Sequence, residues 1–199
     1  MAIPTLNYFD GPGGRAEASR LAFHVGGVEF EDRRFTHEQW GAEYKAKAPT
    51  GLAPWLELED GSYIVESKAI LMYAANKAAL IPKDPVEAAV AEQACSIMDA
   101  CFGPLKSLYM NTEVEKAKVE LAEKLSVADK VIATRQSEST GFISNTGLSY
   151  ADLFVFAFVL GVTTRFPDAM KIENYPHLKK VYEAVKAYPK VAEYYKSRS

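Results

Sequence analysis

Cysteine is scarce in this chain, which has two cysteines among 199 residues. Cys95 and Cys101 are six positions apart in a segment with a helical pattern, a spacing that matches no metal-ligand or redox motif. We therefore expect no disulfide framework and no metal site. Free cysteine is commonly buried, so both thiols are expected to be reduced core residues, as in a cytoplasmic protein. Neither lies in the first eighty residues, which excludes a thiol oxidoreductase with its cysteine at the first strand.

The chain also lacks long apolar runs and an excess of positive charge. The opening MAIPTLNYF has no basic flank followed by a long apolar segment, and no run approaches the roughly 18 apolar residues that a spanning helix needs. We expect a cytoplasmic protein with no membrane partner. The 23 basic and 26 acidic side chains give a net charge of −3 and a pI of about 5.7, so nucleic acid is not an expected partner.

The first eighty residues alternate strand and helix patterns. Residues 4–9 and 28–35 read as strands, and residues 55–67 read as a hairpin closed at Asp60-Gly61. Helical patterns cover residues 15–25, 38–47 and 67–77. The order is βαβαββα, which predicts a small mixed sheet of the thioredoxin kind with helices packed on it.

The remaining chain has only helical patterns. We predict a thioredoxin-like α/β domain over residues 1–79, a linker over 80–86 and an all-α bundle over 87–199. Long helices are expected at 86–109 and 113–138, and shorter ones at 174–188 and from Pro189. Ser149 and Asp152 form a capping box that should start a helix buried on all sides, because apolar residues surround it.

The bend GPGGRAE follows directly after Tyr8, at the end of the first predicted strand. Glycine-rich bends can hold phosphate on backbone N–H groups, but a dinucleotide fingerprint here needs glycine at position 16, which is Ala16. We therefore expect the glycines to turn the chain sharply and to leave a cleft uncrowded.

Two further stretches suit an amino-acid ligand. Pro54 comes directly before a strand and has no N–H, which can leave neighbouring backbone groups free for a ligand; an ordinary trans turn is the alternative to a cis bond. Ser67 begins a helix after Glu66, so that N–H groups, a hydroxyl and a carboxylate lie together, as a zwitterion requires. Plain N-capping by Ser67 is the alternative.

These stretches occur in the order and approximate spacing of the cytosolic glutathione transferases. The Tyr8 bend with Arg15, the pair Trp40 and Lys45, the GLAP turn, VESKAI and SYADLF together resemble that family over the whole chain. The opening is most similar to the sigma class, which includes the haematopoietic-type prostaglandin D synthases and the S-crystallins. The resemblance implies a detoxifying transferase, a homodimer, glutathione as co-substrate and no metal.

The resemblance also implies residue roles. Tyr8 is similar to the tyrosine whose hydroxyl donates a hydrogen bond to the glutathione sulfur, and Arg15 to the arginine that supports it electrostatically. Asp99 resembles the aspartate that reaches across a dimer toward the partner's γ-glutamyl group. The other implied glutathione contacts are Trp40 and Lys45 at the glycyl carboxylate, the backbone of Ala53 before cis Pro54 at the cysteinyl unit, and Glu66 and Ser67 at the γ-glutamyl group, with Leu52 as a further contact.

The chain departs from the sigma pattern at three positions. Gly13 stands where a larger side chain is common, which predicts a more open electrophile pocket. Glu66 replaces a glutamine, as in the theta and delta pattern. Ser107 aligns with the tryptophan that shapes the pocket of the prostaglandin synthases, which argues against that isomerase activity. We expect the electrophile pocket to be lined by Phe9, Gly13, Gly14, Phe102, Leu105, Phe154 and Phe158, with core packing of the apolar side chains as the alternative.

Tyrosine suits position 8 for a chemical reason. A free thiol with a pKa of about 8.5 is only about 3% thiolate at pH 7. Lowering the pKa to about 6.5 makes roughly three quarters of the thiol groups ionised and therefore reactive. The two pKa units correspond to about 2.7 kcal/mol, which is close to the free energy that one charge-assisted hydrogen bond contributes. We therefore predict conjugation of glutathione thiolate to small apolar electrophiles; a prostaglandin D synthase-type isomerase and a non-catalytic structural protein are the alternatives.

Overall fold

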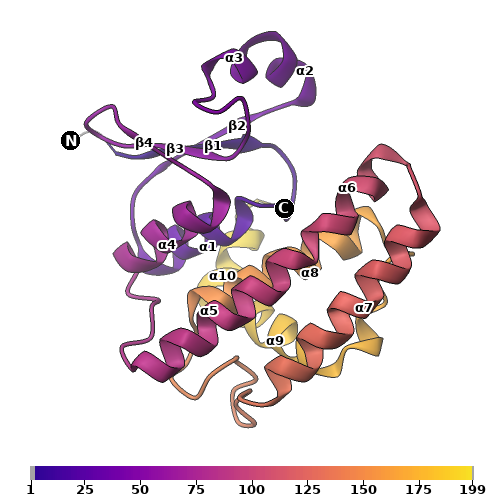
Figure 1. Cartoon of the computed structure of the whole chain (residues 1–199). Coiled ribbons are helices and arrows are strands. Elements are labelled where there is room, and N and C mark those ends of the chain that lie inside the picture. Colours follow the sequence, from indigo (N-terminus) through magenta and orange to yellow (C-terminus); the bar gives the residue numbers. More distant parts are fainter. Residues whose placement is uncertain (1–2, 199) are drawn as a thin grey trace.

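A four-stranded mixed sheet forms the first part of the molecule, as predicted (Figure 1). The computed structural model describes residues 3–198. The strands β1 (Thr5–Phe9), β2 (Glu31–Phe35), β3 (Trp55–Glu57) and β4 (Tyr63–Val65) lie in the order β2-β1-β3-β4. β2 is parallel to β1, whereas β3 is antiparallel to both β1 and β4. The predicted hairpin is confirmed between β3 and β4, where Gly61 has φ 83°.

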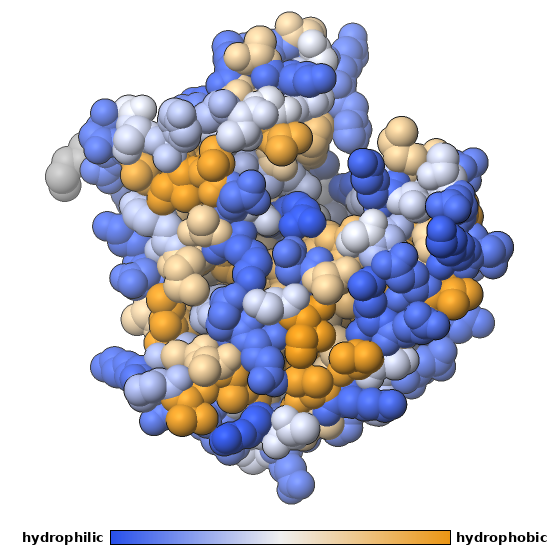
Figure 2. Space-filling model, in the orientation of Figure 1, coloured by the Kyte–Doolittle hydropathy of each residue, from blue (hydrophilic) through white to orange (hydrophobic). Residues whose placement is uncertain are grey.

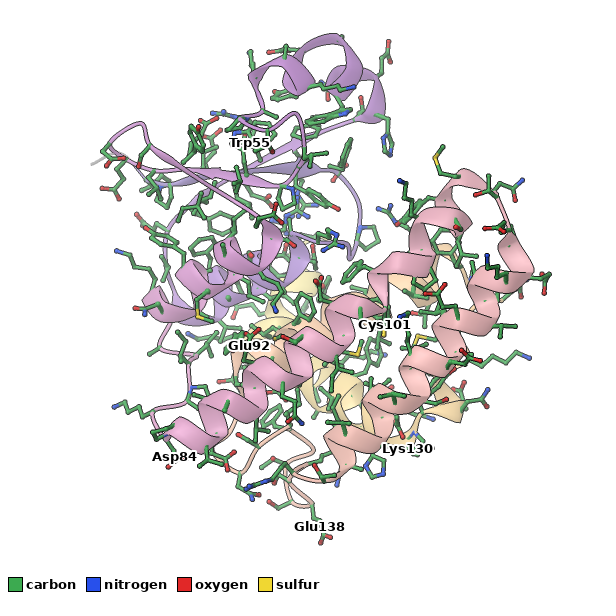
Figure 3. All side chains as sticks on the ribbon, in the orientation of Figure 1. Trp55, Asp84, Glu92, Cys101, Lys130 and Glu138 are labelled. Carbon is green, nitrogen blue, oxygen red and sulfur yellow. The ribbon has the colours of Figure 1, made fainter. Side chains whose placement is uncertain are left out.

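Helices cover both faces of this sheet (Figure 1). On one face, α1 (Glu17–Gly26) and α4 (Ser67–Lys77) pack against apolar side chains such as Leu6 and Leu56. On the other, a short run of α2 (His37–Gln39), π-helical η1 (Trp40–Tyr44) and α3 (Lys45–Lys47) covers a second cluster. Trp55, labelled in Figure 3, belongs to that second cluster because successive strand residues point to opposite faces. The sheet thus separates two cores.

The rest of the chain is helical, as predicted, and packs below and beside the sheet (Figure 1). Its helices are α5 (Pro85–Ala100), α6 (Phe102–Met110), α7 (Val114–Ala133), α8 (Tyr150–Arg165), 3-10 helix η2 (Ile172–Asn174), α9 (Pro176–Lys186) and α10 (Pro189–Lys196). No helix within residues 3–198 is long and apolar enough to cross a membrane.

One predicted helix is in fact two. The expected helix over 86–109 is interrupted at Cys101, which separates α5 from α6 (Figure 3). Pro104 has no N–H to donate to the carbonyl of Ala100 four residues earlier, so the helical hydrogen-bond ladder is broken there. Cys101 and Cys95 are both free thiols and both buried, as predicted.

The other long helix is shorter than expected. α7 ends at Ala133 rather than near residue 138. Beyond it, the Gln136 amide donates to the carbonyls of Gly141 and His177, at 3.0 and 2.9 Å, which ties the following loop to α9. These two side-chain bonds hold Gln136 and the loop after it against α9, where the chain no longer continues α7.

α8 runs through the centre of the bundle, as its apolar sequence predicts. The Asp152 carboxylate accepts from the Ser149 amide and hydroxyl at 2.8 and 2.7 Å, and from the Ile143 amide at 2.7 Å. The predicted capping residues therefore fix both the start of α8 and the loop before it. Every residue from Tyr150 to Val159 is buried, so α8 forms a rigid support for what packs on it.

Candidate active site

A cavity of about 350 Å³ lies between the end of β1 and the helices α6 and α8. Figure 2 shows the surface hollowed between the upper part of the molecule, which carries the sheet, and the arm formed by α6. The lining residues come from both parts of the chain: Tyr8, Phe9, Gly14, Arg15, His37, Phe102, Leu105, Lys106, Tyr109, Met110, Gly161, Val162, Arg165 and Phe166.

Tyr8 stands near the carboxyl end of β1, with its phenol at this cavity. Its oxygen accepts a hydrogen bond from the Arg15 backbone amide at 3.2 Å. The amide occupies an oxygen lone pair, so the phenolic hydrogen stays available for donation; within residues 3–198 it has no acceptor. Burial raises the pKa of Tyr8 and the Arg15 amide lowers it, and the larger effect of burial keeps the proton on the oxygen at neutral pH.

Gly14 allows this arrangement. It has φ +83°, and a Cβ at this position would lie 3.2 Å from the Tyr8 oxygen. Both the backbone conformation and the close approach favour glycine. The bend therefore brings the amide to the phenol without a side chain between them.

The Arg15 guanidinium joins several elements at the site. Its Nη1 lies 3.0 Å from the Asp99 carboxylate of α5 and 3.4 Å from the Ser67 hydroxyl at the start of α4. It also lies over the ring of Phe102, 4.2 Å from the centroid. Both members of the Arg15–Asp99 pair have 39% of their side-chain surface exposed. Asp99, which the resemblance assigns to a contact across a dimer, here binds an arginine of its own chain.

The predicted γ-glutamyl and cysteinyl contacts lie at the neighbouring end of the sheet. The Ala53–Pro54 peptide bond is cis, directly before β3. Ser67 is buried at the first position of α4, and Glu66 before it is exposed with φ 69°. Positive φ is rare for glutamate and concentrates at functional sites. Glu66, Ser67 and the Arg15 guanidinium therefore meet at the amino end of α4, where backbone N–H groups attract anions. Pro54 adjoins this end through the pairing of Trp55 with Val65.

Trp40, Lys45 and Leu52 lie farther from the cavity. Trp40 packs between the rings of Phe9 and Phe35, at centroid distances of 5.4 and 5.5 Å, and so attaches η1 to the sheet. Lys45 is exposed at the start of α3, and Leu52 is 65% exposed in the loop before Pro54. Their predicted glutathione contacts remain predictions.

The predicted electrophile pocket needs correction at Phe154, Phe158 and Gly13, which do not line the cavity; Phe9, Gly14, Phe102 and Leu105 do. Phe154 and Phe158 are core residues of α8, 4% and 2% exposed, whose rings support Phe102 from behind at 6.0 and 4.9 Å. Gly13 is buried against α8 instead of widening the pocket.

Several lining residues were missed by the sequence reasoning. The spacing 154, 158 continues at Val162 and Phe166, one residue every four, and these two positions at the end of α8 reach the cavity. The same helical spacing from Phe102 and Leu105 leads along α6 to Tyr109. Extending the α8 stripe by two turns and the α6 stripe by one turn finds them. His37 carried no comparable signal.

Gly13 and Gly161 hold the two parts of the site together by backbone contact. A Cβ on Gly13 would lie 2.5 Å from the Gly161 Cα and 2.7 Å from its nitrogen, and Gly13 has φ +71°. Contacts under 3 Å require backbone movement. The bend after Tyr8 is therefore seated directly on α8.

We expect Gly13→Ala to lower the free energy of unfolding by about 2–4 kcal/mol, from the unfavourable φ and the forced separation from α8. Gly27→Ala is the matched control, because Gly27 has φ +66° with nothing near its Cβ position. It should cost only about 1–2 kcal/mol. Urea denaturation of both variants measures the difference, and equal losses would contradict the close contact.

Within the described residues, no group of three His, Cys, Asp or Glu side chains is placed to hold a metal ion. The chemical resources of the site are the Tyr8 phenol, the Arg15 guanidinium, the amino end of α4 and an apolar cavity. That combination can bind an anionic peptide and hold an anionic sulfur against a phenolic donor.

Comparison with known proteins gives the same picture over the whole chain. Residues 4–76 match the glutathione S-transferase N-terminal domain and residues 99–198 the glutathione S-transferase C-terminal domain. Glutathione S-transferase 1 of Ascaris suum is 31% identical, with 97% of this chain and 95% of the relative covered. Hematopoietic prostaglandin D synthase of Gallus gallus is 30% identical, with 97% and 95% covered. S-crystallin SL11 of Nototodarus sloanii is 27% identical, with 100% and 98% covered.

Solved structures agree. A glutathione S-transferase of Caenorhabditis elegans superposes with a TM-score of 0.85 at 26% identity, covering 100% of both chains. A glutathione S-transferase of the hookworm Necator americanus, described as monomeric, superposes with a TM-score of 0.80 at 26% identity, covering 100% of this chain and 98% of the other. The thioredoxin-like sheet, the helical bundle and the matches in both parts lead to one conclusion: this chain belongs to the glutathione S-transferase family.

Proposed function

We propose that this chain joins the thiolate of bound glutathione to small, largely apolar electrophiles, with Tyr8 as the activating residue. The observation that carries the proposal is the Tyr8 phenol at the cavity, with the Arg15 amide on its oxygen at 3.2 Å. A phenol that keeps its proton can donate to sulfur, and donation favours the thiolate over the thiol.

The reaction needs no covalent bond to the enzyme. The thiol proton leaves to solvent, the sulfur forms a bond to an electrophilic carbon, and either a leaving group departs with its electron pair or the addition product takes up a proton. Tyr8 stabilises the negative sulfur before attack. Arg15, which faces the cavity and is bound to Asp99, adds positive potential.

Glutathione itself is proposed to lie along the end of the sheet. The buried Ser67 at the amino end of α4, together with Glu66, suits its γ-glutamyl group, and the backbone of Ala53 beside cis Pro54 suits its cysteinyl unit. Trp40 and Lys45 are proposed for its glycyl carboxylate, and Leu52 for a contact beside the cysteinyl unit. The electrophile then occupies the apolar cavity beyond Tyr8.

Two measurements on the unmodified protein test this function. The first follows product formation from glutathione and a chloronitrobenzene; the second titrates the thiolate absorbance of bound glutathione, with S-methylglutathione as the blank. We expect turnover and a thiol pKa well below about 8.5, the ordinary thiol value. Binding of glutathione without turnover would instead support the non-catalytic alternative.

We also propose a cytoplasmic homodimer with the predicted domains 1–79 and 87–199 joined by the linker 80–86. The Asp99 carboxylate remains 39% exposed beside Arg15, which leaves room for a donor from a second subunit. Sedimentation velocity at micromolar concentration should give a species of twice 22.0 kDa. A 22.0 kDa species under those conditions would refute the dimer. The hookworm glutathione S-transferase, described as monomeric, is an example of that outcome.

A further inference from the structure

The cavity carries positive charge that glutathione activation does not use. Its lining includes Arg15, Lys106 and Arg165, and none of the described lining residues is an aspartate or glutamate. This is unexpected in a chain whose net charge is −3. Arg15 is already paired with Asp99 at 3.0 Å. Lys106 and Arg165 form no ion pair within residues 3–198, so their charges are not compensated by the protein.

Arg165 is held in place at the cavity. Its Nη1 donates to the Tyr109 hydroxyl at 3.1 Å, and its guanidinium lies 5.8 Å from the centroid of that ring. The Tyr109 ring in turn packs edge-on against Phe166 at 4.8 Å. On its other side, Arg165 Nη2 lies 3.2 Å from the position of a Cβ on Gly11. The side chain therefore spans from the end of α8 to the bend after β1, with donors left over.

Apolar side chains make up much of the rest of the cavity lining. They are those of Phe9, Phe102, Leu105, Met110, Val162 and Phe166. A ligand that fits such a cavity has an apolar body and a negatively charged end. A guanidinium matches a planar carboxylate with two parallel hydrogen bonds, and an ammonium adds a second positive charge.

We propose that the electrophiles of this protein are amphipathic carboxylates, with the apolar body against α6 and α8 and the carboxylate bound by Lys106 and Arg165. The inference rests on the proposed conjugation reaction and specifies its substrate class. Both cations lie at the exposed outer end of the cavity, so their effect is electrostatic and screened by salt.

The test compares two electrophiles with the same ring and leaving group that differ in one substituent, the charged carboxylate of chloronitrobenzoate and the neutral amide of chloronitrobenzamide. The readout is the ratio of kcat/KM for the acid to kcat/KM for the amide. Arg165 also lies close enough to Tyr8 to favour its ionised form. An effect on thiolate formation changes both substrates equally and cancels in the ratio, whereas an effect on carboxylate binding does not.

We expect Lys106→Met and Arg165→Gln each to lower the ratio about threefold, and the double variant about tenfold, as for partly exposed ion pairs. Arg165→Lys should retain most of it. The matched control is Lys116→Met with Arg135→Gln, which removes the same two charges from α7 and the segment after it, away from the cavity lining. It should leave the ratio unchanged. A double variant with the ratio of the unmodified protein would overturn the proposal.

A failure of the proposed reaction would look different, because neither electrophile would then be consumed. In that case, equilibrium binding of chloronitrobenzoate itself decides the inference. Its Kd should rise about tenfold in the double variant and remain constant in the control. Equal Kd values in all three proteins would refute the carboxylate site independently of catalysis.

Discussion

Replacing Tyr8 by phenylalanine is expected to raise the apparent thiol pKa of bound glutathione by about one to two pH units. One charge-assisted hydrogen bond contributes about 1.5–3 kcal/mol, and about 1.36 kcal/mol corresponds to one unit. From a starting pKa of about 6.5, the thiolate fraction at pH 7 then falls about three- to twenty-five-fold. The rate of conjugation should fall by roughly one order of magnitude or less, because a more basic thiolate is intrinsically more reactive.

The pH profile distinguishes this role from a loss of shape. The variant loses thiolate only below its new, higher pKa, so its kcat/KM should approach that of the unmodified protein in alkaline solution. Tyr63→Phe is the control, because Tyr63 is 57% exposed on β4 and lies outside the cavity lining. A rate deficit that is constant from neutral to alkaline pH would mean that Tyr8 does not act through sulfur ionisation.

Replacing Arg20 by methionine is expected to cost about 3–5 kcal/mol of the free energy of unfolding. The Arg20 side chain is fully buried and donates to Glu17 at 3.2 Å, to Asp32 at 2.9 Å and to the Phe9 carbonyl at 3.3 Å. Its removal would leave the Glu17 carboxylate, 2% exposed, without its cation. The expected loss of stability comes from the unpaired charge left in the core. Replacing both members of a buried ion pair by apolar residues often costs little.

The matched control is Arg33→Met. Arg33 also contacts two carboxylates, those of Glu31 and Glu57 at 3.1 and 3.4 Å, but its side chain is 35% exposed. Water can solvate the carboxylates left behind, so the loss should stay within about 1 kcal/mol. Guanidinium denaturation of both variants gives the comparison. Similar losses of unfolding free energy for Arg20→Met and Arg33→Met would show that burial does not determine how much the Arg20 ion pairs contribute to stability.

Local signals explain which parts of the fold could be predicted. The Asp60-Gly61 turn and the Ser149–Asp152 capping box are each complete within a few residues, and both form as expected. The break at Cys101 also has a local cause, Pro104. It was not predicted because the apolar pattern continues on both sides of the interruption. The positive φ of Glu66 could not be predicted, because nothing local distinguishes this glutamate from others.

The site was predictable where residues contact their sequence neighbours and unpredictable where helices cross. Tyr8 and the Arg15 amide are seven residues apart, and the bend that joins them is visible in the sequence. The positions that face the cavity on α6 and α8 depend on how those helices pack on the sheet. Helical periodicity identified the correct face of α8. On that face, however, Phe154 and Phe158 are buried in the core, and Phe166 lines the cavity.

The contact between Gly13 and Gly161 has a practical consequence for redesign. Since main chain touches main chain there, the distance between the phenol and the wall formed by α8 cannot be adjusted by exchanging side chains at that point. A mutant library aimed at new reactants should leave both glycines untouched and diversify the outer rim at Lys106, Met110 and Phe166. Substitutions at this rim change which electrophiles fit the cavity, while the arrangement of Tyr8 and the Arg15 amide stays constant.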